Sequence, residues 1–267
     1  MAIRRASLHA ARGWTLRKRA RSSEGAGAVD RNSGKIPVMI LAVDTASRAL
    51  SVAVGDADGC RHACFELRSR GQAEELMPMI ERTLAAAGVE RAGLTALAVT
   101  LGPGTFTGLR IGLAAARAMR LALGVPVVGL TVLEVLAAEA SARFPQRPVM
   151  AVLDARRDQV YGQYFADGAP PWGRAWSGPA AMSATAAAEM LVPGTVLAGN
   201  GAALVADAMG AEARASIGPV MITEPEARRM IAIAAARLSG RPAVSRQRAR
   251  ERALAEPPPK PLYLRAP

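Results

Sequence analysis

The fold is decided by one stretch of sequence, Leu101-Gly-Pro-Gly-Thr-Phe-Thr-Gly-Leu-Arg-Ile-Gly112. The apolar run Ala96–Thr100 before it predicts a buried strand, and the apolar spacing from Thr107 to Leu123 predicts a helix. A glycine-rich turn that opens a helix can hold an anion, because unpaired N–H groups and the positive end of the helix dipole meet there. It can also hold a second stretch of backbone, because glycine permits close approach.

This loop does not match the common phosphate-binding signatures. A P-loop requires a lysine after its last glycine, but Leu109 follows Gly108 here. A dinucleotide-binding fingerprint requires a glycine three residues after Gly104, where the chain has Thr107. The residues alone therefore leave a phosphate site and a plain strand-to-helix turn equally open.

The loop, residue by residue, resembles the signature of the TsaB (YeaZ) family, the non-catalytic partners of the tRNA threonylcarbamoyladenosine synthase. The resemblance extends upstream to Ile40-Leu-Ala-Val-Asp-Thr-Ala-Ser47 and downstream to Pro261-Leu-Tyr-Leu-Arg265, so it covers nearly everything after Val38. It implies an α/β fold of the actin-like ATPase (ribonuclease H-like) type, duplicated into two lobes of mixed sheet with helices. A weak internal repeat fits this, because the pattern of an apolar strand, a terminal aspartate and an antiparallel partner occurs at Asp44 and again at Asp154.

The resemblance also implies a function. Such a chain binds and supports a TsaD-like catalytic subunit, together with a TsaE-like ATPase, in threonylcarbamoylation of the adenosine next to the anticodon of ANN-decoding tRNAs. A homodimer is a further form of assembly in this family. The resemblance implies that tRNA is contacted indirectly through the complex, and that no membrane is involved.

Composition and charge limit the number of domains and the cellular environment that the chain is expected to have. The 267 residues are 51% apolar, enough for one large domain or two small ones. The net charge is +12, but residues 1–36 hold nine basic and two acidic residues, so most of the excess lies there. Cys60 and Cys64 are four strand residues apart, roughly 13 Å, which exceeds the reach of a disulfide. We therefore expect a reducing, cytoplasmic location.

Four segments are expected along the chain. Residues 1–37 are a basic, disordered extension; a transit peptide, a nucleic-acid arm and an over-long gene start before Met39 remain alternatives. Residues 38–144 form a first lobe that carries the partner-binding helices, and residues 145–240 form a second lobe. Residues 241–267 are a flexible Arg/Pro-rich tail that ends in a docking segment, Pro261–Arg265.

Three local patterns predict helix ends. Pro78 should kink the helix Gln72–Ala87 or delay its start. Capping boxes at Thr131 and Thr223 should each open a helix, and the second helix should run to Leu238.

The sequence contains no complete set of catalytic residues for the enzyme classes considered. An actin-like sugar or acetate kinase needs intact phosphate loops, but Arg156 stands where active relatives have the glycine of Asp-x-Gly. An M22-type zinc glycopeptidase needs a histidine pair on its metal-binding helix, and the chain has only two histidines, His9 and His62. We predict no catalytic residue, no metal and no cofactor, with residual ATP or ADP binding at the complex only. The vestigial nucleotide or phosphate loops are expected at Asp44, Thr45, Gly102, Gly104, Thr105, Thr107, Asp154, Gly199, Asn200 and Gly201.

The partner interface is expected on the two helices after the third strand, which in the family pair with a second copy or with TsaD. The residues that we assign to it are Leu76, Ile80, Leu84, Leu109, Gly112, Leu113, Ala116 and Arg120. Ala116→Arg should abolish partner binding if this face is exposed, and should unfold the monomer if it packs inside.

Overall fold

The computed structural model describes residues 38–68, 70–166, 177–221, 223–239 and 246–264. The expectations for residues 1–37 lie outside the described residues. The described residues belong to one unit of contacts, Ile36–Pro267. Of the helices in these segments, none has the length and apolar character needed to cross a bilayer.

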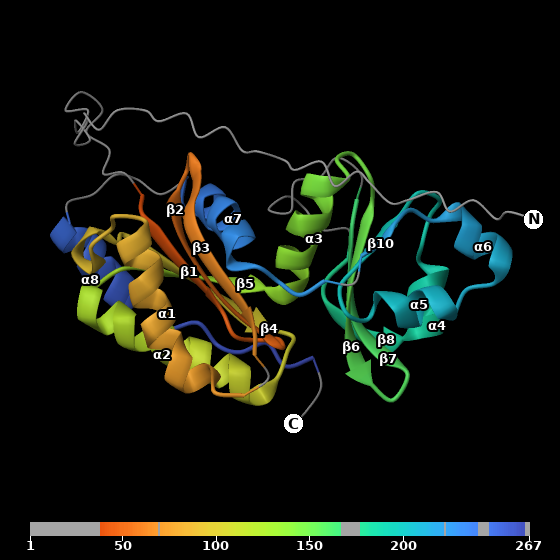
Figure 1. Cartoon of the computed structure of the whole chain (residues 1–267), viewed down its shortest axis with the longest axis horizontal. Helices are drawn as coiled ribbons and strands as arrows, with labels where there is room; N and C mark the ends of the chain where they lie inside the picture. The colour runs from red at the N-terminus through yellow and green to blue at the C-terminus, as the bar shows by residue number, and fades with distance from the viewer. Residues whose placement is uncertain (1–37, 69, 167–176, 222, 240–245, 265–267) are drawn as a thin grey trace, which may run out of the picture. The chain divides into compact units, whose positions relative to one another are not determined.

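The first sheet has the strand order β3-β2-β1-β4-β5 (Figure 1). Two antiparallel hairpins join β1 (Ile40–Asp44), β2 (Ala49–Asp56) and β3 (Gly59–Leu67). On the other side of β1 lie two parallel strands, β4 (Ala96–Gly102) and β5 (Val127–Thr131). The β1 strand is buried along its whole length, which explains its continuous apolar sequence.

The second sheet repeats this arrangement with the order β10-β9-β6-β7-β8. Antiparallel pairing joins β6 (Val149–Arg156), β7 (Gln159–Phe165) and β8 (Ala180–Ser183). Parallel pairing adds β9 (Val196–Ala198) and β10 (Val220–Met221) on the other side of β6. Both sheets therefore consist of two hairpins and two parallel additions, so the internal repeat inferred from the sequence is a repeat of topology.

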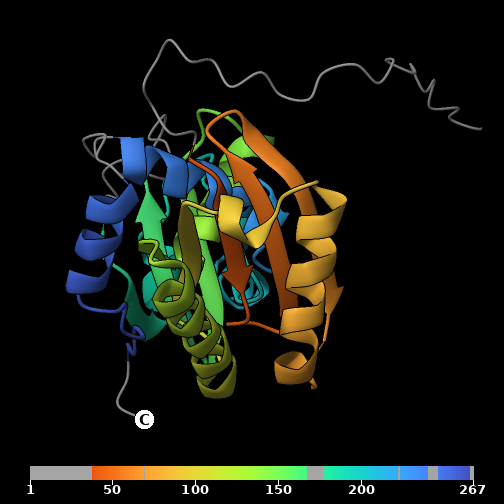
Figure 2. The same cartoon turned by 90° about the vertical axis from the view of Figure 1, so that its left-hand side faces the viewer.

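Helices cover both faces of the first sheet (Figures 1 and 2). On one face, α1 (Gln72–Ala86) and α2 (Phe106–Leu123) pack against β1, β2 and β4. On the other face, α7 (Ala227–Ser239) packs against β1, β2 and β3. Each face has its own apolar core, one that includes Leu76 and Ile80 of α1 and one that includes Met230 and Ile231 of α7.

The second sheet is covered by α3 (Val132–Arg143) on one face, where the helix contributes Leu133 and Leu136 to the core. The other face carries α4 (Ala184–Glu189) and α5 (Ala202–Asp207). The remaining short elements are η1 (Arg91–Gly93) and α6 (Ala211–Ser216). The α3 helix also contacts β4, β5 and α7, which explains why most of its residues are buried.

The α1 helix begins at Gln72 and includes Pro78, so of the two outcomes expected of this proline the delayed start is not observed. Two other expectations about local structure are corrected. The capping box expected at Thr223 is absent: α7 begins at Ala227, whose N–H donates to Ser51 Oγ in β2. The α7 helix packs on the first sheet, although the division at residue 145 assigned it to the second lobe. By contrast, the capping box of Thr131 and Glu134 is present in full.

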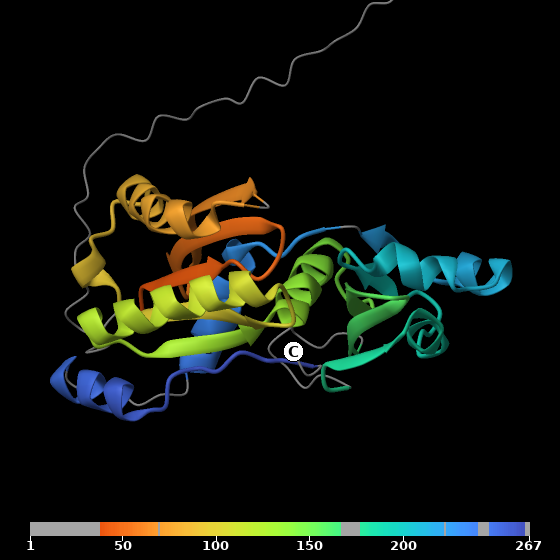
Figure 3. The ribbon, with the colours of Figure 1, turned by 90° about the horizontal axis from the view of Figure 1, so that it is seen from below.

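The C-terminal region contains a helix, α8 (Arg246–Ala255), where we expected a flexible connector. Its end is held by the buried guanidinium of Arg120 in α2, which donates to the carbonyl oxygens of Ala253, Leu254 and Glu256. From there the chain runs back along α2 (Figure 3), and Arg117 donates to the Pro259 carbonyl at 2.8 Å. The expected docking of the last segment is confirmed for its described part, because Leu262 N–H donates to the Leu101 carbonyl at 2.7 Å.

Candidate functional site

The glycine-rich loop packs against the backbone of Thr45 and Ala46, the two residues that follow β1. Thr105 N–H donates to the Ala46 carbonyl at 2.7 Å, and Thr45 Oγ1 donates to the Gly108 carbonyl at 2.7 Å. A Cβ atom at Gly104 would lie 2.3 Å from Ala46 O, and one at Gly108 would lie 1.9 Å from Thr45 O. The chain that leaves β1 therefore occupies the space that the glycines keep free.

The same packing continues one turn into α2. A Cβ atom at Gly112 would lie 2.5 Å from Thr45 Oγ1. Thr105 is the N-cap residue of α2, and its hydroxyl accepts from Gly108 N–H at 3.2 Å. Of the two alternatives left open by the sequence, close approach of a second backbone accounts for these glycines. Thr107 lies exposed on the first turn of the helix.

Asp44 lies at the end of β1 and is completely buried. Its Oδ1 accepts from Thr100 Oγ1 at 2.6 Å, whereas its Oδ2 has no hydrogen-bond partner. Burial raises the pKa of Asp44 to about 7, and the nearby charge of Glu224 acts in the same direction against the lowering effect of the Thr100 hydrogen bond. The carboxyl group therefore keeps its proton to a much higher pH than an exposed aspartate does.

The second set of expected loops also comes together. Asp154 N–H donates to Asn200 Oδ1 at 2.9 Å, so the loop 199–201 lies beside the end of β6. A Cβ atom at Gly199 would lie 2.1 Å from Val152 O, and one at Gly201 would lie 2.8 Å from the Leu153 carbonyl carbon. As in the first lobe, these glycines allow two backbones to approach each other.

Arg156 occupies a special backbone position in the turn after β6. Its φ is 66°, in the left-handed region that glycine favours, and this explains why a glycine suits this position. Its N–H donates to Asp154 Oδ1 at 2.7 Å, and its exposed guanidinium lies 3.8 Å from Asp154 Oδ2. Arg156 thus pairs with the carboxylate of the second loop.

The face that we assigned to a partner lies inside the chain. All eight of its residues are buried. The leucine and isoleucine side chains of α1 pack on the sheet, and Leu113 and Ala116 of α2 pack on Val99. Leu109 joins the core around α3, and Arg120 binds the end of α8. The interface prediction is therefore corrected: these helices bury their apolar stripe against their own sheet, so a partner can meet only their outward faces.

The outward faces of α1 and α2 carry small and apolar residues. On α1, Ala73 and Met77 are exposed. On α2, Ala114, Ala118 and Leu121 are exposed at helical spacing. Since the two helices contact each other, their outward faces form a shared surface, called the α1–α2 surface below.

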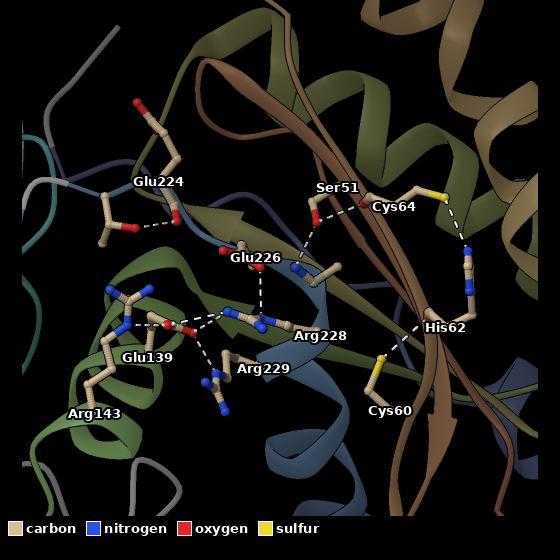
Figure 4. A network of polar contacts seen from close by, with 12 residues as sticks. Ser51, Cys60, His62, Cys64, Glu139, Arg143, Glu224, Glu226, Arg228 and Arg229 are labelled. Carbon is tan, nitrogen blue, oxygen red and sulfur yellow. Dashed lines mark hydrogen bonds and ion pairs between the residues drawn. The ribbon is translucent and has the colours of Figure 1, made fainter. Parts of the chain in front are cut away.

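An ion-pair network connects α3 and α7 (Figure 4). The buried carboxylate of Glu139 lies 2.6 Å from Arg229 Nε, 2.8 Å from Arg143 Nε and 3.4 Å from Arg228 Nη2. Burial alone would raise the pKa of Glu139, but the hydrogen bonds from Arg229 and Arg143 and the charges of Arg229 and Arg228 lower it below its ordinary value. Sequence patterns gave no sign of the pairing with α7, because Arg228 and Arg229 lie about 90 residues from Glu139.

No three His, Cys, Asp or Glu side chains among the described residues are grouped so that they could hold a metal ion. Figure 4 shows that the side chains of Cys60 and Cys64 point in different directions from β3. Cys64 Sγ lies 3.7 Å from His62 Nε2, and Cys60 Sγ contacts the His62 carbonyl. Both cysteines are free, in agreement with the distance argument from the sequence.

The repeated sheet topology, with Asp44 and Asp154 at corresponding strand ends, defines an actin-like α/β protein with a duplicated fold. The family model "TsaD: tRNA N6-adenosine threonylcarbamoyltransferase" matches residues 66–169. The TsaB protein of Escherichia coli, named for tRNA threonylcarbamoyladenosine biosynthesis, is 38% identical over 122 residues, which are 46% of this chain and 52% of that protein. The chain spans about half the length of the curated relatives it matches.

Two solved structures from Pseudomonas aeruginosa extend the similarity. YeaZ superposes with a TM-score of 0.68 at 26% identity and covers 85% of this chain and 100% of its own. A protein described by its similarity to peptidase YeaZ superposes with a TM-score of 0.69 at the same identity and coverage. These relatives and structures support the resemblance to the TsaB (YeaZ) family that the glycine-rich loop indicated.

Proposed function

We propose that this chain functions in the biosynthesis of threonylcarbamoyladenosine in tRNA, as a subunit without catalytic residues of its own. It binds and supports a TsaD-like catalytic subunit, with a TsaE-like ATPase as a further member of the complex. The modified nucleoside is the adenosine next to the anticodon of ANN-decoding tRNAs, and the location is the cytoplasm. The name of the E. coli relative, which places that protein in tRNA threonylcarbamoyladenosine biosynthesis, supports this role.

The α1–α2 surface is the observation that carries the proposal. Ala114 and Ala118 are small, so a partner helix can approach α2 near the short end of the 8–10 Å range of interaxial distances. Leu121 is 65% exposed and Met77 is 42% exposed, so burial of both by a partner removes apolar area from water. The same surface would serve a homodimer when the catalytic subunit is absent.

The two loop sets support a role in assembly over one in phosphate transfer. The backbone of Thr45 and Ala46 occupies the space beside Gly104 and Gly108, and Arg156 pairs with the carboxylate of Asp154. We propose that this chain binds no nucleotide alone and that any ATP or ADP lies at the complex.

The experiment is co-expression of the full chain with the TsaD-like subunit of the same cell, followed by size-exclusion chromatography. Ala118→Arg places a bulky cation on the exposed side of α2, and burial of an unpaired charge should weaken binding by about 100-fold or more. Ala213→Arg, at an exposed alanine of α6, is the matched control and should bind normally. Circular dichroism should show that both variants are folded.

Two results would contradict the proposal at different points. If Ala118→Arg binds like the unaltered chain, the interface lies elsewhere on the molecule. If the unaltered chain does not bind the TsaD-like subunit, the proposed function itself is wrong.

A further inference from the structure

An exposed pair of aromatic rings lies at the N-terminus of α2. Phe106 is 45% exposed and Tyr263 is 42% exposed, and their ring centroids are 6.0 Å apart with an angle of 32° between the planes. Exposed apolar groups that lie next to each other mark interaction sites more often than single ones do, and neither ring belongs to the apolar core clusters of the described residues. The pair is therefore a candidate for binding a flat ligand.

A cation completes the arrangement. The guanidinium carbon of Arg110, one turn along α2, lies 3.7 Å from the centroid of the Phe106 ring. Arg110 is exposed and forms no ion pair with any carboxylate of the described residues. Phe106, Arg110 and Tyr263 together are called the aromatic platform below.

The platform is held in place before any ligand arrives. Tyr263 lies in the tail segment 257–264, which is fixed by the hydrogen bond from Leu262 N–H to Leu101 O. Arg117 anchors the same tail at the Pro259 carbonyl, and Arg120 anchors the end of α8. Preorganised planar groups lose little conformational entropy when they bind, so this arrangement favours a ligand with a flat face.

Exposed cations lie at the platform. The α2 helix carries no acidic residue, and of its three arginines Arg110 is exposed, whereas Arg117 and Arg120 bind the tail and the end of α8. The tail segment 257–264 carries Lys260 and no acidic residue. A polyanion with flat, unpaired bases matches both properties, because bases stack on aromatic rings and on arginine, and phosphates are attracted by the cations. A protein partner matches only the apolar part, so RNA is the occupant that the surface favours.

We propose that the aromatic platform stacks an unpaired base of RNA, so that this chain contacts the tRNA directly. The identification of that RNA as a tRNA anticodon loop rests on the proposed function; the stacking itself does not. This differs from the indirect contact that the family resemblance implies. Phe106 and Tyr263 receive the base, and Arg110 keeps Phe106 oriented and adds positive charge next to the phosphate backbone.

Fluorescence anisotropy with the full chain tests the proposal. The probes are a labelled single-stranded RNA with an anticodon-loop sequence and an abasic strand of the same length and charge. Loss of one stacked base should weaken binding by about 5- to 100-fold, so the chain should prefer the base-containing strand by that factor. The abasic strand is the necessary comparison, because the basic residues 1–36 attract both strands equally.

The variants make the test specific. Phe106→Leu and Tyr263→Leu should each reduce the preference for the base-containing strand, and Tyr263→Phe should retain it. Phe65→Leu is the matched control, because Phe65 is 41% exposed on β3 and lies outside the platform. Its preference should equal that of the unaltered chain.

Three results would overturn the proposal. The first is that the unaltered chain binds the base-containing and the abasic strand equally well. The second is that Phe106→Leu keeps the full preference for the base-containing strand. The third is that the platform variants bind RNA normally but no longer bind the TsaD-like subunit. In the last case the platform is a protein interface. Each result can occur while the unaltered chain still forms the complex, so failure of this inference is distinguishable from failure of the proposed function.

Discussion

Gly108→Ala tests whether the glycine-rich loop exists to accept a second backbone. The new Cβ atom would lie 1.9 Å from Thr45 O and 2.6 Å from Thr105 Oγ1, far inside ordinary contact distance. Since the nearer atom belongs to backbone, relief requires the chain after β1 to move. Movement would break the hydrogen bonds from Thr45 Oγ1 to Gly108 O and from Thr105 N–H to Ala46 O.

The magnitude follows from these contacts. Overpacking costs about 1–3 kcal/mol, and each lost hydrogen bond costs about 0.5–1.5 kcal/mol. Replacement of glycine by alanine in a helix stabilises the folded chain by about 1 kcal/mol. We expect Gly108→Ala to lower the free energy of unfolding by roughly 2–4 kcal/mol, which lowers Tm by about 5–15 °C in a protein of this size.

Thermal unfolding followed by circular dichroism measures this change. Gly93→Ala is the control, because a Cβ atom there meets nothing within 4 Å and its φ is not in the left-handed region. Its Tm should stay within about 2 °C of the unaltered chain. A Gly108→Ala protein with an unchanged Tm would refute the close packing of loop and strand end, and would reopen the anion-binding interpretation.

Three further predictions concern buried groups. Ala116→Arg should unfold the monomer and not merely release a partner, because Ala116 packs on Val99; a folded Ala116→Arg monomer by circular dichroism would show that this side of α2 is accessible. The raised pKa of Asp44 means that the folded chain keeps a proton up to about pH 7 that the unfolded chain releases near 3.8, so this contribution to stability is full below pH 3.8 and is lost as pH rises through 7. Asp44→Asn should therefore gain a few kcal/mol relative to the unaltered chain at pH 8 and little at pH 4 in urea titrations, and parallel curves at the two pH values would contradict the shift. Arg120→Met should lower the free energy of unfolding by about 2–4 kcal/mol and expose residues 246–264 to rapid proteolysis, because it removes hydrogen bonds to three carbonyl groups at the end of α8; equal proteolysis of both proteins would argue against this anchor.

The sequence predicted the elements around the glycine-rich loop well, because their signals are local. Apolar spacing located α2 to within one residue, and the capping box at Thr131 located the start of α3. The occupant of the loop could not be predicted, since it is the backbone of Thr45 and Ala46, about 60 residues upstream. The same limit hid the pairing of Glu139 with Arg228 and Arg229.

The interface residues show a second limit. Periodicity correctly grouped Leu76, Ile80 and Leu84 on one face of α1, but an apolar face can meet its own sheet as well as a partner. For α8 a usable signal was present. Residues 246–255 contain no glycine or proline and consist of good helix formers, yet their high charge suggested a flexible tail. The anchor at Arg120 is again a contact between distant segments.

The threonylcarbamoyladenosine content of cellular tRNA tests the central claim most directly. Mass spectrometry of nucleosides from cells depleted of this chain should show a loss of the modification. The unaltered chain should restore it, Ala213→Arg should restore it equally, and Ala118→Arg should not. An unchanged level of the modified nucleoside after full depletion would contradict the account.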